Sequence, residues 1–318
     1  MTNTIQPKSF QILLPILSIA FCLLQPLPAY SDEEVQAYSN WEEKFIKSNI
    51  AVSNFFDDIA RGIDQFFVNK SQTSRENKSS VALENVSNSS EGQNVDNVTH
   101  IIANLRLPNV EDYFQLKFTS YDENEERGSK KKYGQPSTRQ QNYGATVGLF
   151  KKLGDIKTSF QPRIDLQDPL KVSHSLSFDT SAKLSNYEIN PKLEFFANPD
   201  KGTGVFLAIN YRFFLTKSYS LNWINEGEYE EKKRQFSTII GLSLVQEITE
   251  KSTLAYSFFT NSNNRPAYHL DNYNFSVTWN HILYSKILFY QIIPRLSFAS
   301  EQSFKGTAGL ALVINLNF

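Results

Sequence analysis

Strict alternation of apolar and polar residues runs through the second half of the chain and limits its fold more than any other feature. In the last ten residues, "GLALVINLNF", every second residue from Leu310 to Phe318 is large and apolar. The stretches "NYNFSVTWN" and "TGVFLAINYRFF" show the same period. A period of two residues is typical of a β-strand with one apolar face. Each run has about 9–12 residues, the length that a tilted strand needs to cross a bilayer.

The composition of the two strand faces separates a membrane barrel from a soluble β protein. One face is dense in Phe, Tyr, Leu, Ile and Trp, in a chain that has 25 Phe and 15 Tyr but a polar mean hydropathy of −0.39. The other face holds mainly Ser, Asn, Gly and Thr with isolated charges. Backbone groups within lipid must all be paired, which requires a closed sheet. The sequence therefore predicts a transmembrane antiparallel β-barrel with an apolar outer face and a mildly polar interior.

Turn positions divide the region from about residue 79 to Phe318 into strands. The longer connections, above all residues 122–140, alternate with shorter ones, which is the asymmetry expected of outer-membrane barrels. The alternating runs that start near Asp112, together with Val98–Leu107, give an odd total. Because single-chain bacterial barrels favour even numbers, we add "SSVALEN" as a weak first strand. The prediction is an all-β barrel of about fourteen strands, with about twelve as the alternative.

Residues 1–31 have the composition of a secretory signal peptide. Lys8 precedes an apolar run from Ile12 to Leu24, and small residues follow that run. Phe21 precedes Cys22 where lipoprotein processing requires a small residue, so we assign Cys22 to the apolar core of the signal. An uncleaved membrane anchor is the alternative. Later in the sequence, no stretch approaches the ~18 apolar residues that a membrane helix needs. We therefore expect cleavage of the signal and export to the bacterial outer membrane.

An amphipathic helix is expected between the signal peptide and the barrel, over residues 39–70. Apolar residues from Trp41 to Phe66 recur at helical spacing, and Ser39 with Glu42 forms a capping box. The apolar face of this helix could cover part of its own protein, lie on a membrane or pack on a partner. The mixed charge of its polar face favours the first of these. A polar linker over residues 71–78 then leads to the barrel, residues 79–318.

Two resemblances add to this interpretation. Alternating apolar residues that end in an aromatic resemble the signal read by the bacterial outer-membrane assembly machinery, and here they are Leu310, Leu312, Ile314, Leu316 and Phe318. The segments "ANLRLPNVEDYFQLKF" and "FYQIIPRLSF" resemble those of a loosely defined group of uncharacterised proteobacterial outer-membrane proteins. That second resemblance covers residues 79–318 and implies no activity. The expected partners are outer-membrane lipid and, through the last strand, the assembly machinery.

Charged residues on the polar strand face are candidates for the lining of a lumen. They are Lys117, Lys157, Arg163, Asp165, Asp179, Lys192, Glu194, Arg212 and Arg295. One interpretation is a pore lining that selects solutes by charge. The other is an electrostatic network that braces the interior, because buried charges must be paired. About fourteen strands lie between small barrels filled by side chains and open porins, so both interpretations stay open. Loop charges such as "EYEEKKRQ" are expected in solvent.

The sequence contains no strong catalytic or metal-binding pattern. His269 has Asp271 two positions on, in an expected outer loop, but no neighbouring nucleophile. There is no Gly-rich phosphate loop, Ser elbow or metal-ligand spacing, and the net charge of −1 gives no reason to expect nucleic acid. We therefore predict a protein without catalysis, cofactor or metal: a passive channel or a structural membrane protein. The alternatives are an outer-membrane hydrolase and a translocation barrel with the N-terminal helix in or near the lumen.

Overall fold

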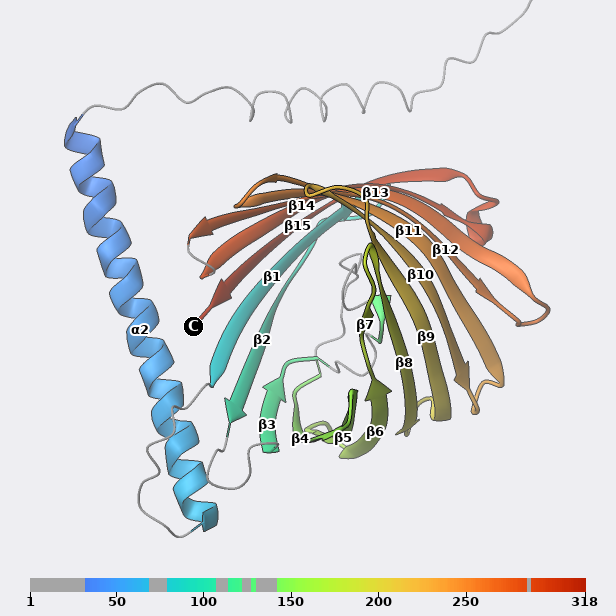
Figure 1. The fold of residues 1–318 in the computed structure, drawn as a ribbon, viewed down its shortest axis with the longest axis horizontal. Helices are drawn as coiled ribbons and strands as arrows, with labels where there is room; N and C mark the ends of the chain where they lie inside the picture. The colour runs from blue at the N-terminus through green and yellow to red at the C-terminus, as the bar shows by residue number, and fades with distance from the viewer. Residues whose placement is uncertain (1–31, 69–78, 107–113, 122–126, 130–141, 285–286) are drawn as a thin grey trace, which may run out of the picture. The chain divides into compact units, whose positions relative to one another are not determined.

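A computed structural model describes residues 32–68, 79–106, 114–121, 127–129, 142–284 and 287–318. The signal peptide expected over residues 1–31 and the polar linker expected over residues 71–78 lie outside these residues. The strands of the described part form one antiparallel sheet in which most neighbouring strands are consecutive in the chain (Figure 1).

Fifteen strands make up this sheet. They are β1 (Ser80–Ser90), β2 (Asp96–Arg106), β3 (Phe114–Thr119), β4 (Gly144–Leu153), β5 (Ile156–Asp165), β6 (Lys171–Asp179), β7 (Ala182–Lys183), β8 (Tyr187–Asn198), β9 (Gly202–Phe214), β10 (Tyr219–Glu230), β11 (Gln235–Thr249), β12 (Ser252–Asn263), β13 (His269–Tyr284), β14 (Leu288–Ala299) and β15 (Gly306–Asn317). A short 3-10 helix, η2 (Ser300–Gln302), lies between β14 and β15.

The sheet closes on itself. The first strand, β1, pairs with the last strand, β15, and β6 pairs with β8. Strand β7 is only two residues long and pairs with β8, which leaves fourteen strands in the wall. The predicted all-β barrel of about fourteen strands is therefore confirmed. The weak first strand that parity required is β1, and closure depends on it because it joins β2 to β15.

Alternate residues along each strand point to opposite faces, and the outward face is apolar. On β9, Leu207 and Ile209 are exposed, whereas Phe206 and Ala208 are buried. Other large apolar side chains exposed on this outward face are Ile101, Phe118, Leu149, Phe160, Ile164, Val172, Phe195, Trp223, Ile240, Leu242, Tyr256, Phe275, Leu296, Leu310, Leu312 and Ile314. In a soluble barrel the outward face would carry charged residues. Here that face is apolar, as the alternation predicted.

The inward face buries mainly small polar side chains. They include Ser159, Ser173, Ser175, Ser177, Asn222, Ser243, Asn274, Ser276 and Asn315. Hydroxyls bond across neighbouring strands, for example Ser159 Oγ with Ser177 Oγ at 2.6 Å. A separate apolar cluster of Val86, Ile293, Ala311 and Val313 lies inside the wall at β1, β14 and β15. Small inward side chains leave space inside the barrel for larger charged groups.

The connections between strands differ in length at the two ends of the barrel. Of the described connecting residues, one end carries 91–95, 120–121, 142–143, 166–170, 199–201, 231–234, 264–268 and 300–305. The other carries 154–155, 180–186, 215–218, 250–251 and 287, together with the start of β1 and the end of β15. The longest connection, residues 120–143, lies between β3 and β4. It supplies the segment on which the candidate site is built.

The N-terminal part of the described chain is one helix, α2 (Asp32–Val68). It begins earlier than the helix expected over residues 39–70, so the predicted capping box at Ser39 and Glu42 is wrong. An ion pair between Lys47 Nζ and Glu43 Oε1, at 2.6 Å, links successive turns. None of the described helices is both long and apolar enough to cross a bilayer.

Candidate functional site

A short segment of the β3–β4 connection, Arg127–Ser129, lies against the inner wall formed by β8, β9 and β10. Arg127 Nε donates to Glu194 Oε1 at 2.7 Å, and the guanidinium carbon stands 3.7 Å from the centroid of the Phe196 ring. The backbone N–H of Ser129 donates to both carboxylate oxygens of Glu226, at 2.8 and 2.9 Å. Because β5 and β6 separate β4 from β8 in the wall, this segment joins two distant sectors of the barrel.

Glycine at position 128 allows this close approach. Gly128 has φ of +59°, a conformation that L side chains rarely adopt. A Cβ atom there would lie 2.5 Å from Phe206 Cζ and 2.6 Å from Glu226 Oε1. Any larger residue would therefore push the segment away from the wall.

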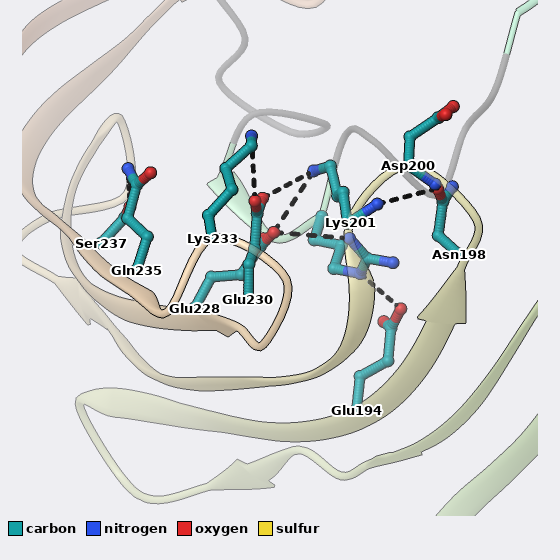
Figure 2. Close-up of polar contacts among 10 residues, drawn as sticks. Glu194, Asn198, Asp200, Lys201, Glu228, Glu230, Lys233, Gln235 and Ser237 are labelled. Carbon is teal, nitrogen blue, oxygen red and sulfur yellow. Dashed lines mark hydrogen bonds and ion pairs between the residues drawn. The ribbon is translucent and has the colours of Figure 1, made fainter.

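Charges of alternating sign extend this contact toward the turn between β8 and β9. Figure 2 shows Lys201 between two carboxylates, and its Nζ lies 3.4 Å from Glu228 Oε1 and 3.2 Å from Glu230 Oε1. Glu230 Oε2 is also 3.0 Å from Lys233 Nζ. Burial lowers the pKa of Lys201, but the carboxylates of Glu228 and Glu230 outweigh this and raise its pKa above the ordinary lysine value. Lys201 is therefore a fixed positive charge at neutral pH.

Arg127 connects this group to a second buried pair. Its Nη1 lies 3.6 Å from Glu228 Oε1, and Glu194 binds Lys192 Nζ through its other oxygen at 2.7 Å. The side chains of Arg127 and Glu194 are 4% and 5% exposed. Because a buried charge must be compensated by a partner, the network fixes the segment in place. We call Arg127, Lys192, Glu194, Lys201, Glu228 and Glu230 the lumen network.

A cavity of about 350 Å³ borders the lumen network. Its lining residues are Arg127, Lys201, Phe206, Glu226, Gly227, Glu228, Glu230, Ser237, Thr238, Ile239, Asn261, Ser262, Asp271 and Asn272. This described lining has four carboxylates against two cationic groups, with hydroxyls and amides between them. The cavity therefore presents an acidic, strongly hydrogen-bonding surface.

A second pair, Arg163 and Asp165, holds the two ends of the β3–β4 connection. Arg163 Nε donates to Asp165 Oδ1 at 2.5 Å, and its Nη1 donates to Thr119 Oγ1 at 2.5 Å. Its Nη2 donates to the backbone oxygen of Asn142 at 2.8 Å. Thr119 ends β3 and Asn142 precedes β4, so this arginine braces the base of the segment that carries Arg127.

The nine charged residues proposed from the sequence lie on inward strand positions, but they do not form one group. Arg163 with Asp165, and Lys192 with Glu194, are ion-paired. Asp179 lies opposite both Lys157 and Lys192 in the ladder.

The other three sequence candidates lie elsewhere on the inner wall. Lys117 lies opposite Thr146, and Arg212 lies opposite Glu188. Arg295 Nη2 donates to Ser90 Oγ at 3.2 Å. Whether any of the nine contacts a passing solute stays a prediction.

Several members of the site were missed by the sequence analysis. "EYEEKKRQ" was expected in solvent, but Glu228 and Glu230 belong to β10 and point inward. Their spacing carried a usable signal, since Asn222, Glu226, Glu228 and Glu230 occupy alternate positions of one strand. Arg127 and Lys201 belong to connections, where no period indicates which side chains turn inward.

The described histidines contact serine or carboxylate oxygens at three places, and the shortest of these contacts joins His281 Nδ1 to Ser252 Oγ at 2.6 Å. His269 Nε2 does lie 2.9 Å from Asp271 Oδ1, but its Nδ1 is 2.7 Å from the backbone oxygen of Ala267. With both ring nitrogens facing oxygen atoms, His269 has no nitrogen left to activate a nucleophile. His100 and Ser120 approach each other at 3.4 Å, but both are buried. Among the described residues, no three His, Cys, Asp or Glu side chains group as metal ligands.

Fold and site together define a class: a closed β-barrel with an apolar outer surface, a charged interior and a chain segment held against its inner wall. No family model and no curated protein matches this chain. It is similar in structure to OmpF of Salmonella typhi, with 5% identity and a TM-score of 0.47 over 76% of this chain and 97% of that one.

Two further solved structures are similar to it at the same low identity. OmpT of Vibrio cholerae has 6% identity and a TM-score of 0.46 over 78% of this chain and 100% of that one. The KdgM porin has 6% identity and a TM-score of 0.37 over 74% of this chain and 99% of that one. With TM-scores this low, the three likenesses carry no weight for function, which is argued from the site.

Proposed function

We propose that the chain is a passive channel of the bacterial outer membrane and that Arg127–Ser129 narrows its passage. The observation that carries this proposal is the anchoring of that segment to Glu194 and Glu226 on the inner wall. A barrel that served only as a membrane scaffold would gain nothing from a segment pinned inside by buried charges, which are expensive to desolvate. A channel gains a defined cross-section.

The size and lining of the barrel support the same proposal. Barrels of about eight strands are filled by their own side chains, whereas this wall has fourteen strands and many inward serines. The apolar outward face supports placement in a bilayer. With the longest connection, residues 120–143, assigned to the extracellular side, β1 starts and β15 ends on the periplasmic side.

The cavity charge supports a preference for cationic solutes. Glu226, Glu228, Glu230 and Asp271 line this space together with Arg127 and Lys201. A ring of carboxylates lowers the energy of a cation that enters and raises that of an anion. We expect weak cation selectivity, because the two positive groups offset part of the field.

Planar bilayer recording of the purified, refolded protein tests the proposal. We expect discrete, voltage-independent conductance steps. In a KCl gradient, the sign of the reversal potential should show that the channel conducts K⁺ better than Cl⁻. The matched variant Glu228→Gln should shift that reversal potential toward zero, while Glu301→Gln, an exposed loop position, should leave it unchanged. A folded barrel that inserts but conducts no current would contradict the proposal and favour a structural role.

We further propose that the cellular assembly machinery recognises the last strand, through Leu310, Leu312, Ile314, Leu316 and Phe318. Leu310, Leu312 and Ile314 are exposed on the outward face of β15, which supports their availability to a receptor before the barrel closes. Hydrolase activity receives less support, since the ring of His269 is engaged on both sides.

A further inference from the structure

One sector of the outward face, on β1 and β2, is polar rather than apolar. Asn85 lies opposite Ile314 on β15 and Ser87 lies opposite Leu312, so both share the outward face with these exposed apolar residues. On the other side, Asn85 pairs with Thr99 and Ser87 with Asn97. We call Asn85, Ser87, Asn97 and Thr99 the β1–β2 patch.

The register places this patch directly beside apolar residues of the last strand. Residues opposite each other in an antiparallel ladder have Cβ atoms about 4.5–5.5 Å apart, so Asn85 and Ser87 adjoin Ile314 and Leu312. Those two residues belong to the apolar band of the barrel. The inward neighbours, Val86 and Val313, are apolar and buried. Between Asn85 and Ser87 the outward side chains are therefore polar and the inward Val86 is apolar, whereas elsewhere on these strands Glu84 and His100 lie inward and Ile101 lies outward.

Side-chain hydrogen bonds within the patch are extensive but incomplete. Asn85 Nδ2 donates to Thr99 Oγ1 at 2.9 Å and to Asn97 Oδ1 at 3.1 Å. Asn97 Nδ2 donates to Asn85 Oδ1 at 3.1 Å and to Ser87 Oγ at 2.6 Å. These bonds use the N–H groups of both side-chain amides. The hydroxyl hydrogens of Ser87 and Thr99, and one lone pair on each amide oxygen, remain available for further hydrogen bonds. In the described part of the chain, no other contact uses them.

Contact between this polar surface and lipid hydrocarbon is unfavourable. Lipid tails can neither donate nor accept hydrogen bonds, so each unmet polar group in the bilayer has a free-energy cost. Small polar residues on a membrane-facing surface instead allow close approach of another protein and hydrogen bonds to it. The patch therefore favours a protein neighbour within the membrane.

We propose that the β1–β2 patch is the contact between two copies of this chain, related by a two-fold axis along the membrane normal. The leftover groups include both donors and acceptors and no charge, so the patch is complementary to itself. A two-fold axis in this direction brings the same residues together at the same height. Ile101, Leu312 and Ile314, all exposed, border the patch and supply apolar packing around the hydrogen bonds. This inference goes beyond the proposed channel function, because each barrel has its own lumen.

Disulfide cross-linking in intact membranes tests this contact. The one cysteine of the sequence, Cys22, lies in the expected signal peptide and is replaced by Ser as a precaution. Ser87→Cys should then give a disulfide-linked species of twice the chain mass when membranes are oxidised. The control is Leu207→Cys on β9, which is equally outward and exposed and should stay monomeric. Thr99→Cys serves as a second probe if Ser87→Cys fails to fold.

A second measurement separates a specific contact from chance collision. The double variant Asn85→Leu with Asn97→Leu makes the patch apolar, which is compatible with contact to lipid. It should convert the dimer extracted in detergent into a monomer. An unchanged heat-dependent gel shift would show that the barrel still folds. The proposal is overturned if the unmodified chain is monomeric, if Leu207→Cys cross-links as well as Ser87→Cys, or if Ser87→Cys joins a protein of another mass. Failure of the conductance experiment would leave these results unaffected.

Discussion

Arg127 and Glu194 are 67 positions apart in the chain, yet the guanidinium Nε of one donates to a carboxylate oxygen of the other at 2.7 Å inside the barrel. Both side chains are almost completely shielded from solvent. Charge-assisted bonds of this kind are strong when both partners are present and expensive when one is removed. The contact therefore holds residues 127–129 against the inner wall, and most of the expected behaviour of the proposed channel depends on it.

Removal of this contact should enlarge the passage. Arg127→Ala frees the segment from Glu194 and Phe196, so single-channel conductance should rise, with a loss of about 1–3 kcal/mol in the free energy of unfolding. Gly128→Ala should act in the same direction, because a Cβ at that position meets Phe206 and Glu226. Bilayer recording of both variants checks this. Lys305→Ala, an exposed loop position, is the control, and a conductance equal to that of the unmodified chain in both variants would argue against a constriction.

The brace at the base of the connection should matter more for stability than for conductance. Arg163→Met leaves Asp165 buried without its partner, which should lower the free energy of unfolding by about 3–5 kcal/mol. The double variant Arg163→Met with Asp165→Asn removes both charges and should recover part of this loss. Urea titration of the barrel in liposomes measures both variants. Equal destabilisation in the single and double variants would show that the pair is not coupled.

Two neighbouring residues of β5 test which face meets lipid. Phe160 is exposed on the outward face, and Gln161 lies half-buried on the inward face. Phe160→Arg should cost about 2–4 kcal/mol of stability in a bilayer, as expected for arginine near the membrane midplane. Gln161→Arg should cost much less, because the inward face is polar. Folding yield into liposomes compares the two, and a reversed order would mean that the faces have been assigned the wrong way round.

The last strand should affect assembly in cells more than intrinsic folding. The main chain of Phe318 pairs with that of Val81, its N–H donating to Val81 O at 2.8 Å. Phe318→Ala keeps these backbone bonds but removes the aromatic ring from the proposed assembly signal. We expect less heat-modifiable barrel in the outer membrane and an unchanged rate of refolding in detergent. Leu207→Ala, an outward apolar position outside the signal, is the control; equal losses in both variants would speak against recognition of the last strand.

Some of this structure could be predicted from local pattern because the information is local. The two-residue period of segments such as Gly309–Phe318 reflects side chains that alternate between lipid and interior, and it specifies strands wherever one face is apolar. The same period gave the length, number and outward face of the strands, and parity identified β1 as the strand needed for closure. The charged inward residues Arg163, Asp165 and Glu194 were found by this rule as well.

The site itself required the tertiary structure. Arg127 and Lys201 lie in connections, where backbone direction is set by distant contacts with Glu194, Glu228 and Glu230 rather than by any period. The β1–β2 patch could not be predicted from the sequence either. The register of β1 against β15 decides that the Asn85 side chain lies on the outward face beside Ile314, and a shift of one residue would turn it inward. The sequence by itself determined a barrel with an apolar outer surface. Closure of the sheet decided which charges meet inside it, since those residues become neighbours only when distant strands complete the ring.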